Sequence, residues 1–204
     1  MKSQVYLIFS VLLFISCASQ QTPVSHDFKE LNLTDEQIFN ATAQPKDHPL
    51  ILRRTTLIVR DLKTSLELYR DALGMEVIYD NMLTRPRRDG TEGTQDVRLV
   101  FLKATHEYVG VLGLLEYYYG EEREEKEIRK EGFTAQNIVL LFNSRDVKEK
   151  FEKIRNVRSI EVIQEPELVE YPSYDGTSKI RVLASTFYDP DGFIVEFNEL
   201  LDSI

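Results

Sequence analysis

The order and spacing of apolar segments repeat once along the chain, and this repeat limits the folds that it can adopt. Residues 54–59 have the β-branched and apolar character of a strand. From residue 62 to 73, apolar side chains recur at helical spacing after the capping residue Asp61. Three more strands are predicted at 75–79, 96–103 and 108–117. The first half therefore has the order strand, helix and three strands.

The same order returns in the second half. Ser144 or Asp146 caps its predicted helix, whose apolar positions have the same spacing as those of the first helix. The four predicted strands cover residues 136–142, 159–164, 179–188 and 193–200. We therefore predict an α+β fold made of two βαβββ modules, at about 51–118 and 134–200.

Distances along the sequence relate the two halves more closely. Gly113 lies as far beyond Arg54 as Glu196 lies beyond Asn137, so a single period of 83 connects the two pairs. An equal spacing in one pair can arise by chance, but the matching order of elements supports a true repeat. The two modules are predicted to form one domain over residues 50–202.

Residues 1–17 have the features of an export signal. Lys2 precedes an apolar run, residues 5–15, that is too short to span a bilayer. The run ends in the letters FISC, similar to a bacterial lipobox, so Cys17 is the predicted lipidation site. An ordinary signal peptide cut nearby, or an uncut membrane anchor, are the alternatives. Residues 18–49 are polar and contain several prolines, and we interpret them as a tether.

This lipid anchor predicts a location in the cell envelope. No Asp follows Cys17 to indicate retention in the inner membrane, so the outer membrane of a Gram-negative bacterium is expected. Several acyl chains bind a membrane firmly, at about 0.8 kcal/mol per buried methylene. The membrane is therefore one expected partner.

Charge and cysteine usage exclude other classes. The formal net charge of -9 repels nucleic-acid phosphates, so no nucleic-acid partner is expected. With one cysteine, the chain can form neither an internal disulfide nor a metal site built on several thiolates.

Two stretches resemble the vicinal oxygen chelate superfamily, which contains glyoxalases, bleomycin-resistance proteins and extradiol dioxygenases. They read TTLIVRDLKTSLELYRDALGMEVIYD at residues 55–80 and FYDPDGFIVEF at 187–197. The resemblance covers roughly residues 51–200 and implies eight strands curled into an open cup. It further implies a divalent metal held by the first and last strands of each module.

The residues at those four positions do not suit a metal. Carried over by the resemblance, the positions fall at Arg54, Gly113, Asn137 and Glu196. Only Glu196 matches the ligand type of the family, because a guanidinium cannot ligate a metal and glycine has no side chain. Glu116 has the opposite strand parity to Gly113, so we expect it to point away from the cup. We expect no cofactor, with a divalent metal as the alternative.

Arg54 suggests a different use of the cup. A guanidinium fork suits a buried carboxylate, so Arg54 is expected to reach Glu196 across the cup. Arg54, Asn137 and Glu196 are the predicted residues for binding a small anionic or carbonyl ligand. In the alternative, the Arg54–Glu196 pair only closes the barrel. Tyr171 and Tyr174, in a predicted loop, are lid candidates.

These observations favour a metal-independent, small-molecule-binding lipoprotein that is not an enzyme. One alternative is a lyase or dioxygenase of the same superfamily with atypical metal ligands. Another is a non-catalytic protein-interaction module. A homodimer is also possible, because modules of this family can share a cup within one chain or between two.

Overall fold

The computed structural model describes residues 50–88, 90–119, 128–173 and 175–202. The predicted signal peptide, the lipidation site Cys17 and nearly all of the tether lie outside these ranges. Within them, no helix has the length and hydropathy needed to cross a membrane.

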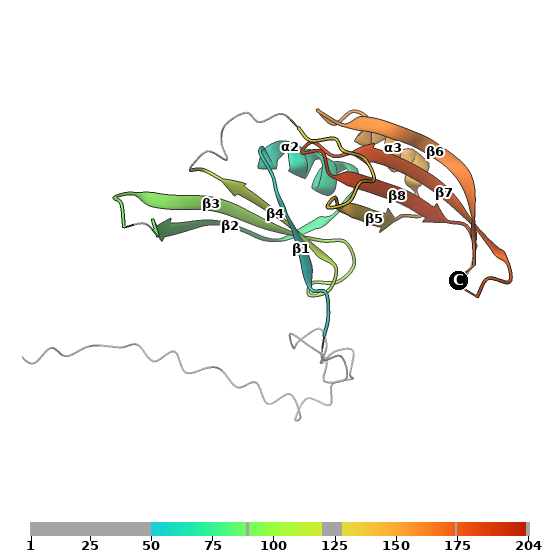
Figure 1. Ribbon diagram of the computed structural model, residues 1–204, viewed down its shortest axis with the longest axis horizontal. Helices are drawn as coiled ribbons and strands as arrows, with labels where there is room; N and C mark the ends of the chain where they lie inside the picture. The colour runs from blue at the N-terminus through green and yellow to red at the C-terminus, as the bar shows by residue number, and fades with distance from the viewer. Residues whose placement is uncertain (1–49, 89, 120–127, 174, 203–204) are drawn as a thin grey trace, which may run out of the picture.

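The first module is a four-stranded sheet covered by one helical segment (Figure 1). Its elements are β1 (Arg54–Ile58), α2 (Leu62–Leu66), η2 (Glu67–Ala72), β2 (Glu76–Pro86), β3 (Thr94–Lys103) and β4 (Val111–Tyr117). The strand order is β1-β4-β3-β2. β1 runs parallel to β4, and the other pairs are antiparallel.

The second module repeats this arrangement. Its elements are β5 (Val139–Asn143), α3 (Val147–Ile154), β6 (Glu161–Pro172), β7 (Lys179–Tyr188) and β8 (Ile194–Leu200). The strand order is β5-β8-β7-β6, again with the first and last strands of the module parallel. The two sheets lie side by side and bend into an open arch (Figure 1), which confirms the predicted α+β fold of two βαβββ modules.

The helical segment of the first module begins at a well-formed cap. The Asp61 carboxylate accepts hydrogen bonds from the backbone N–H of Lys63 at 3.0 Å and from Thr64 Oγ1 at 2.6 Å. Glu116 of β4 accepts the N–H of Leu62 at 3.2 Å. Glu116 therefore points away from the Gly113 side of the sheet, as its parity predicts.

The second part of this segment differs from the single α-helix that was predicted. From Glu67 to Ala72 the backbone is a π-helix, and the N–H of Leu73 reaches the carbonyl of Leu68 at 2.9 Å, five residues back. Gly74 follows with a φ of +83°, a conformation that favours glycine. The predicted end at Gly74 is thus correct, but the wider helical turn was not visible in the apolar spacing.

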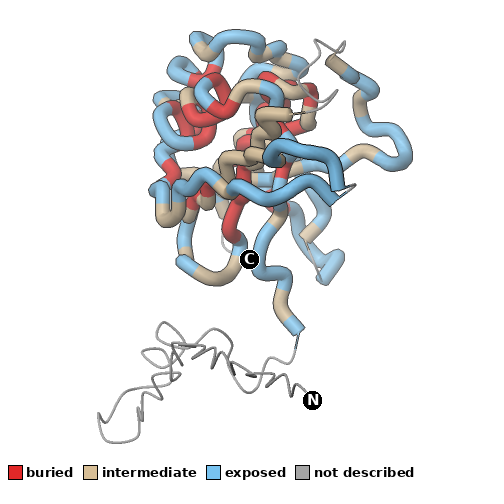
Figure 2. The backbone as a smooth tube through the Cα atoms, turned by 90° about the vertical axis from the view of Figure 1, so that its left-hand side faces the viewer, coloured by how far each residue is buried: buried red, intermediate tan, exposed pale blue. Residues whose placement is uncertain are grey.

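One hydrophobic core joins the two modules. Leu66 and Tyr69 of the first module share a cluster of buried residues with Phe151, Phe187 and others of the second. The Phe151 and Phe187 rings meet at 6.2 Å with an interplanar angle of 69°. Buried residues gather in the middle of the domain, whereas the outer loops are exposed (Figure 2).

The outer strands are longer than predicted. β2 extends to Pro86 and β6 extends to Pro172, whereas the predicted strands ended at residues 79 and 164. β6 is an edge strand and its pairing with β7 is irregular between Gln164 and Glu167. Pro166 is tolerated there because an edge position and a break in register do not need its missing N–H.

The strand register corrects the predicted period. Thr56 pairs with Gly113 in the first module, whereas Leu141 pairs with Glu196 in the second. Equivalent positions of β1 and β5 are therefore two residues further apart in sequence than equivalent positions of β4 and β8. Val139, not Asn137, is the register equivalent of Arg54, so the single period was wrong for the first strand.

Candidate functional site

The face of each sheet that is turned away from the helices is called the open face below. Leu57 and Val59 are buried in the core, so the alternating β1 side chains of Arg54, Thr56 and Ile58 lie on the open face. By the same alternation the open-face side chains of β5 are Val139 and Leu141. Ile58 is 51% exposed and Leu141 is 54% exposed, so this part of the open face is not filled by packing.

The open face holds the four positions at which the resemblance places metal ligands. Corrected for register, they are Arg54 on β1, Gly113 on β4, Val139 on β5 and Glu196 on β8. Only the Glu196 carboxylate is a hard oxygen donor suited to a divalent metal. The described ranges contain no group of three or more His, Cys, Asp or Glu residues that could hold a metal ion. This set of donors does not fit the metal centre that the resemblance implies.

Arg54 is held by its own module. Its Nε donates a hydrogen bond to Thr56 Oγ1 at 2.9 Å. Its guanidinium carbon lies 4.1 Å from the centre of the Phe101 ring of β3. Within the described ranges no ion pair joins Arg54 to Glu196. The expected bridge across the cup was therefore wrong, because Phe101 and Thr56 give the guanidinium partners close to its own strand.

Glu196 lies in a different setting. Its neighbours on the adjacent strands are Leu141 of β5 and Thr186 of β7. On the far side of Thr186, Gln164 of β6 donates from Nε2 to Glu167 at 2.9 Å. The second half of the open face therefore presents carboxylate and amide oxygens, whereas the first half presents a cation.

Asn137 lies outside the strands, in the turn before β5. Its Nδ2 donates to the carbonyl of Gly132 at 2.8 Å, and its Oδ1 accepts the N–H of Ile138 at 2.9 Å. Both ends of the amide thus hold the turn, and the predicted role in ligand binding stays a prediction.

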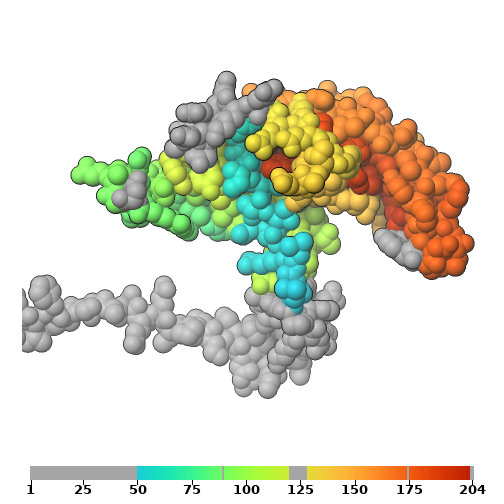
Figure 3. Space-filling view, viewed as in Figure 1, coloured from blue at the N-terminus to red at the C-terminus, as the bar shows by residue number. Residues whose placement is uncertain are grey.

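A cavity of about 420 Å³ lies where the two modules meet. Its walls include Ile58 of β1, Asn137, Phe193 and the segment 128–131. In the space-filling view the yellow segment lies close to the cyan β1 (Figure 3). The same segment also packs against the turn between β7 and β8, where Gly192 leaves room for it: its φ is +91°, and an added Cβ would lie 2.2 Å from the carbonyl oxygen of Arg129.

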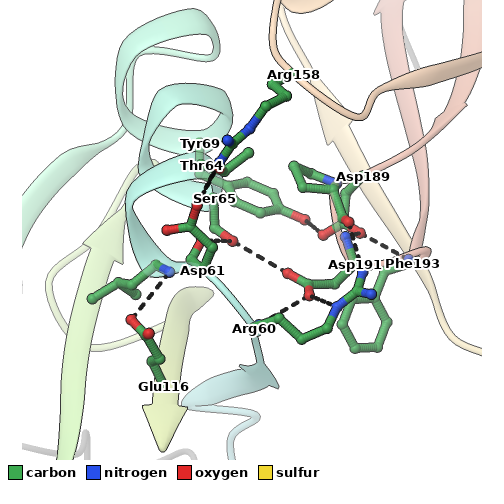
Figure 4. Close-up of polar contacts among 12 residues, drawn as sticks. Arg60, Asp61, Thr64, Ser65, Tyr69, Glu116, Arg158, Asp189, Asp191 and Phe193 are labelled. Atoms are coloured by element: carbon green, nitrogen blue, oxygen red, sulfur yellow. Dashed lines mark hydrogen bonds and ion pairs between the residues drawn. The ribbon is translucent and has the colours of Figure 1, made fainter. Parts of the chain in front are cut away.

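A polar network locks the turn between β7 and β8 to the first module (Figure 4). The buried Asp189 carboxylate accepts the Tyr69 hydroxyl at 2.8 Å and the backbone N–H groups of Asp191 and Phe193 at 2.9 and 2.8 Å. Arg60 donates from Nε to Asp191 at 3.0 Å and from a terminal nitrogen to the Pro190 carbonyl at 2.9 Å. The DPDG segment is therefore a structural turn, as its sequence predicts.

Burial changes the acidity of this network. Desolvation raises the pKa of Asp189 to about 6, and the neighbouring Asp191 adds to the rise. The hydrogen bonds from Tyr69 and Phe193 act in the opposite direction. Desolvation and the Asp189 charge also raise the pKa of the Tyr69 phenol well above its ordinary value. The sequence did not reveal this pair, although a tyrosine on an apolar helix face needs a partner for its hydroxyl.

The structure describes one of the two lid candidates, Tyr171. Tyr171 belongs to β6, not to a loop, and is 47% exposed. Tyr174 lies outside the described residues. Tyr171 faces Ile180 of β7 across the pair of strands, so its position as part of a covering loop was wrong.

Comparisons with known proteins agree with the fold. Residues 51–197 match the family model for the Glyoxalase/Bleomycin resistance protein/Dioxygenase superfamily. The chain therefore belongs to this superfamily. No curated protein sequence matches the chain.

A solved structure shows the same fold at low sequence identity. A glyoxalase family protein from Bacillus cereus is 14% identical and superposes with a TM-score of 0.57, over 78% of this chain and 100% of that one. Glyoxalase I from Leishmania major is 22% identical over 74% of this chain and 86% of that one, with a TM-score of 0.47. At such identities the likeness concerns the fold alone.

Proposed function

We propose that the open face is a metal-independent binding site for a small molecule. The observation that carries this proposal is the replacement of the metal-ligand positions: Arg54, Gly113 and Val139 accompany a single carboxylate, Glu196. Arg54, Gly113 and Val139 offer no side-chain donor to a divalent cation, which supports binding without a metal.

The exposed apolar side chains favour ligand binding over an open face that is filled by packed side chains. Ile58 and Leu141 lie on β1 and β5, an edge strand of each sheet, and are each about half exposed. Apolar walls with a few polar groups are typical of small-molecule sites. Arg54 and Glu196 supply those polar groups, from opposite modules.

The test combines metal analysis and ligand screening with a variant whose open face is filled by a larger side chain. The purified full chain is screened by thermal shift against small organic acids, carbonyl compounds and aromatic molecules, before and after treatment with EDTA. We expect no stoichiometric divalent ion, and ligand-induced shifts that survive EDTA. The substitution Leu141→Trp should abolish these shifts by filling the face.

Leu168→Trp is the matched control. Leu168 is 61% exposed, but it pairs with Leu183 on the helix side of the second sheet. This variant should keep the ligand shifts of the wild type. A stoichiometric metal whose removal abolishes binding, or equal loss in both Trp variants, would contradict the proposal.

We also propose that the chain is a lipoprotein anchored in the bacterial envelope through Cys17. The signal-like segment and the FISC letters support this assignment. Cells grown with labelled palmitate should incorporate the label into the protein and retain it in the membrane fraction. Cys17→Ser should lose both, and retention of the label in that variant would refute lipidation at this residue.

A further inference from the structure

Gly113 lies in the middle of β4 and has no conformational reason to be glycine. It pairs with Thr56 on one side and Phe101 on the other, in regular register. Its φ lies outside the left-handed region that favours glycine. A glycine inside a strand costs about 0.5–1 kcal/mol relative to alanine and often marks a close approach of other atoms.

Two side chains of β1, Thr56 and Arg54, make the close approach at Gly113. A Cβ at position 113 would lie 3.1 Å from Arg54 Cδ and 2.7 Å from Thr56 Oγ1. Arg54 therefore crosses over β4 at the one place where no side chain rises from that strand. Without this gap, the guanidinium would not reach the Phe101 ring of β3.

The guanidinium ends a row of flat groups. The Phe101 ring stacks on Tyr79 of β2 with centroids 4.7 Å apart and planes at 23°. On its other side, by strand order, the Arg54 guanidinium carbon lies 4.1 Å from the ring centre. The hydrogen bond from Arg54 Nε to Thr56 fixes the rotation of the guanidinium group. Arg54 is thus an ordered cation on an exposed face.

Among the described residues, the terminal nitrogens of Arg54 have no hydrogen-bond partner. Neither nitrogen makes a hydrogen bond or ion pair with a residue of the described ranges, although the side chain is held at Nε and over a ring. A guanidinium fork held in this way matches the two oxygens of a carboxylate or phosphate, with little rotamer entropy left to lose.

We propose that Arg54, laid over Phe101 through the gap at Gly113, binds the oxyanion group of a carboxylate- or phosphate-bearing ligand. This inference rests on the proposed function and names the ligand class of the same open face. Gly113 and Thr56 are positioning residues, because they act on the ligand only through the place and orientation of the guanidinium.

The probes are benzoate and inorganic phosphate, each titrated into the full chain by isothermal titration calorimetry. We expect Arg54→Ala to weaken binding of the preferred probe by about tenfold or more, because a charge-assisted, two-pronged contact is lost. Arg54→Lys should recover only part of the loss, since the amine keeps the charge without the fork. Gly113→Ala should weaken binding about as much as Arg54→Ala, although it leaves the arginine in place.

Arg53→Ala is the matched control. Arg53 is the neighbouring exposed arginine, and its guanidinium carbon lies 4.3 Å from the Tyr108 ring. It has the same charge and a similar aromatic contact, but the opposite strand parity, so binding should change by less than about twofold. Equal weakening by Arg53→Ala and Arg54→Ala would reduce the effect to general charge attraction and overturn the inference.

The substitutions must leave the fold intact, and urea midpoints equal to that of the wild type show this. A normal affinity in folded Gly113→Ala would overturn the role of the gap. Failure of both probes to bind, while neutral molecules still give shifts that Leu141→Trp abolishes, would overturn the oxyanion inference and leave the proposed function standing. Loss of all ligand binding in the wild type would instead count against the proposed function itself.

Discussion

Polar groups are arranged differently at the junction between the modules and on the open face. At the junction, polar groups such as Asp189 and Tyr69 are buried and hydrogen-bonded across 120 residues of sequence. On the open face, Arg54 and Glu196 belong to different modules and do not pair within the described ranges. The junction uses its polar groups to hold the halves together, whereas in the function proposed above the polar groups of the open face bind a ligand.

This contrast explains how the fold can form although the four open-face positions do not carry a set of metal ligands. The core and the DPDG turn depend on contacts that each need both modules. Within the described ranges no hydrogen bond or ion pair joins the side chain of Arg54 or Glu196 to the other module, so substitutions at these two positions should leave the junction unchanged. Stability variants and binding variants should therefore separate cleanly.

The largest expected effect is at the shared core. Phe151→Ala removes a fully buried ring that contacts Phe187, and we expect a loss of about 3–5 kcal/mol in the free energy of unfolding. Urea unfolding followed by circular dichroism measures this loss. Because the core is continuous, one cooperative transition should remain, and two separated transitions would show that the modules unfold independently.

Asp189 should give the junction a pH dependence that the open face lacks. Its folded pKa of about 6 lies above the ordinary value of 3.8. The folded state therefore holds the proton where the unfolded state has released it, so this group destabilises the protein as pH rises from about 4 to 6. The full penalty at pH 7 is about 3 kcal/mol.

Asp189→Asn removes that titration. The stability difference between wild type and variant should shift toward the wild type by up to about 3 kcal/mol as pH falls from 7 to 4. Exposed carboxylates with lowered pKa, such as Asp61, act in the opposite direction but are common to both proteins. A difference that does not change with pH would show that Asp189 titrates normally.

Arg60 should contribute an intermediate amount. Arg60→Ala removes two hydrogen bonds to the turn and leaves the 6%-exposed side chain of Asp191 without its cation, while the Arg60 N–H still donates to that carboxylate. We expect a loss of about 1–2 kcal/mol in unfolding free energy. Arg158→Ala breaks an exposed pair with Asp61 and should cost less than about 1 kcal/mol. Equal costs would mean that burial at the turn adds nothing.

The smallest effects on stability are expected on the open face. Arg54→Ala and Glu196→Gln should each change the free energy of unfolding by no more than about 0.5 kcal/mol, because within the described ranges neither side chain makes a hydrogen bond or ion pair with the other module. Chemical denaturation measures both values. A loss several times larger in either variant would give the open face a structural role and weaken the contrast.

The sequence predicted what depends on local pattern. The alternation of β7 gives its observed bounds, and the capped start and glycine end of the first helical segment follow from Asp61 and Gly74. The parity of Glu116 also gave its direction correctly. These features depend on neighbours within a few residues, so they can be read from one segment at a time.

The errors come from features that no single segment contains. A shift of two positions between the modules moves the equivalent of Arg54 from Asn137 to Val139, and only the pairing of strands reveals it. The partner of Arg54 is set by the absence of a side chain at Gly113, on a strand far along the chain. Sequence comparison treats that glycine as a missing ligand, whereas the structure shows it as space for another residue.

The continuous core also sets the order in which the protein can form. Phe187, Val195 and Phe197 of the last two strands complete a cluster that begins with Leu57 of the first. Until those strands are synthesised, the apolar face of the first helical segment has no cover from them. Contacts so distant in sequence form late and slowly, and incomplete chains expose apolar surface that promotes aggregation. A chain truncated before residue 187 should therefore aggregate and should not fold as an independent half-domain.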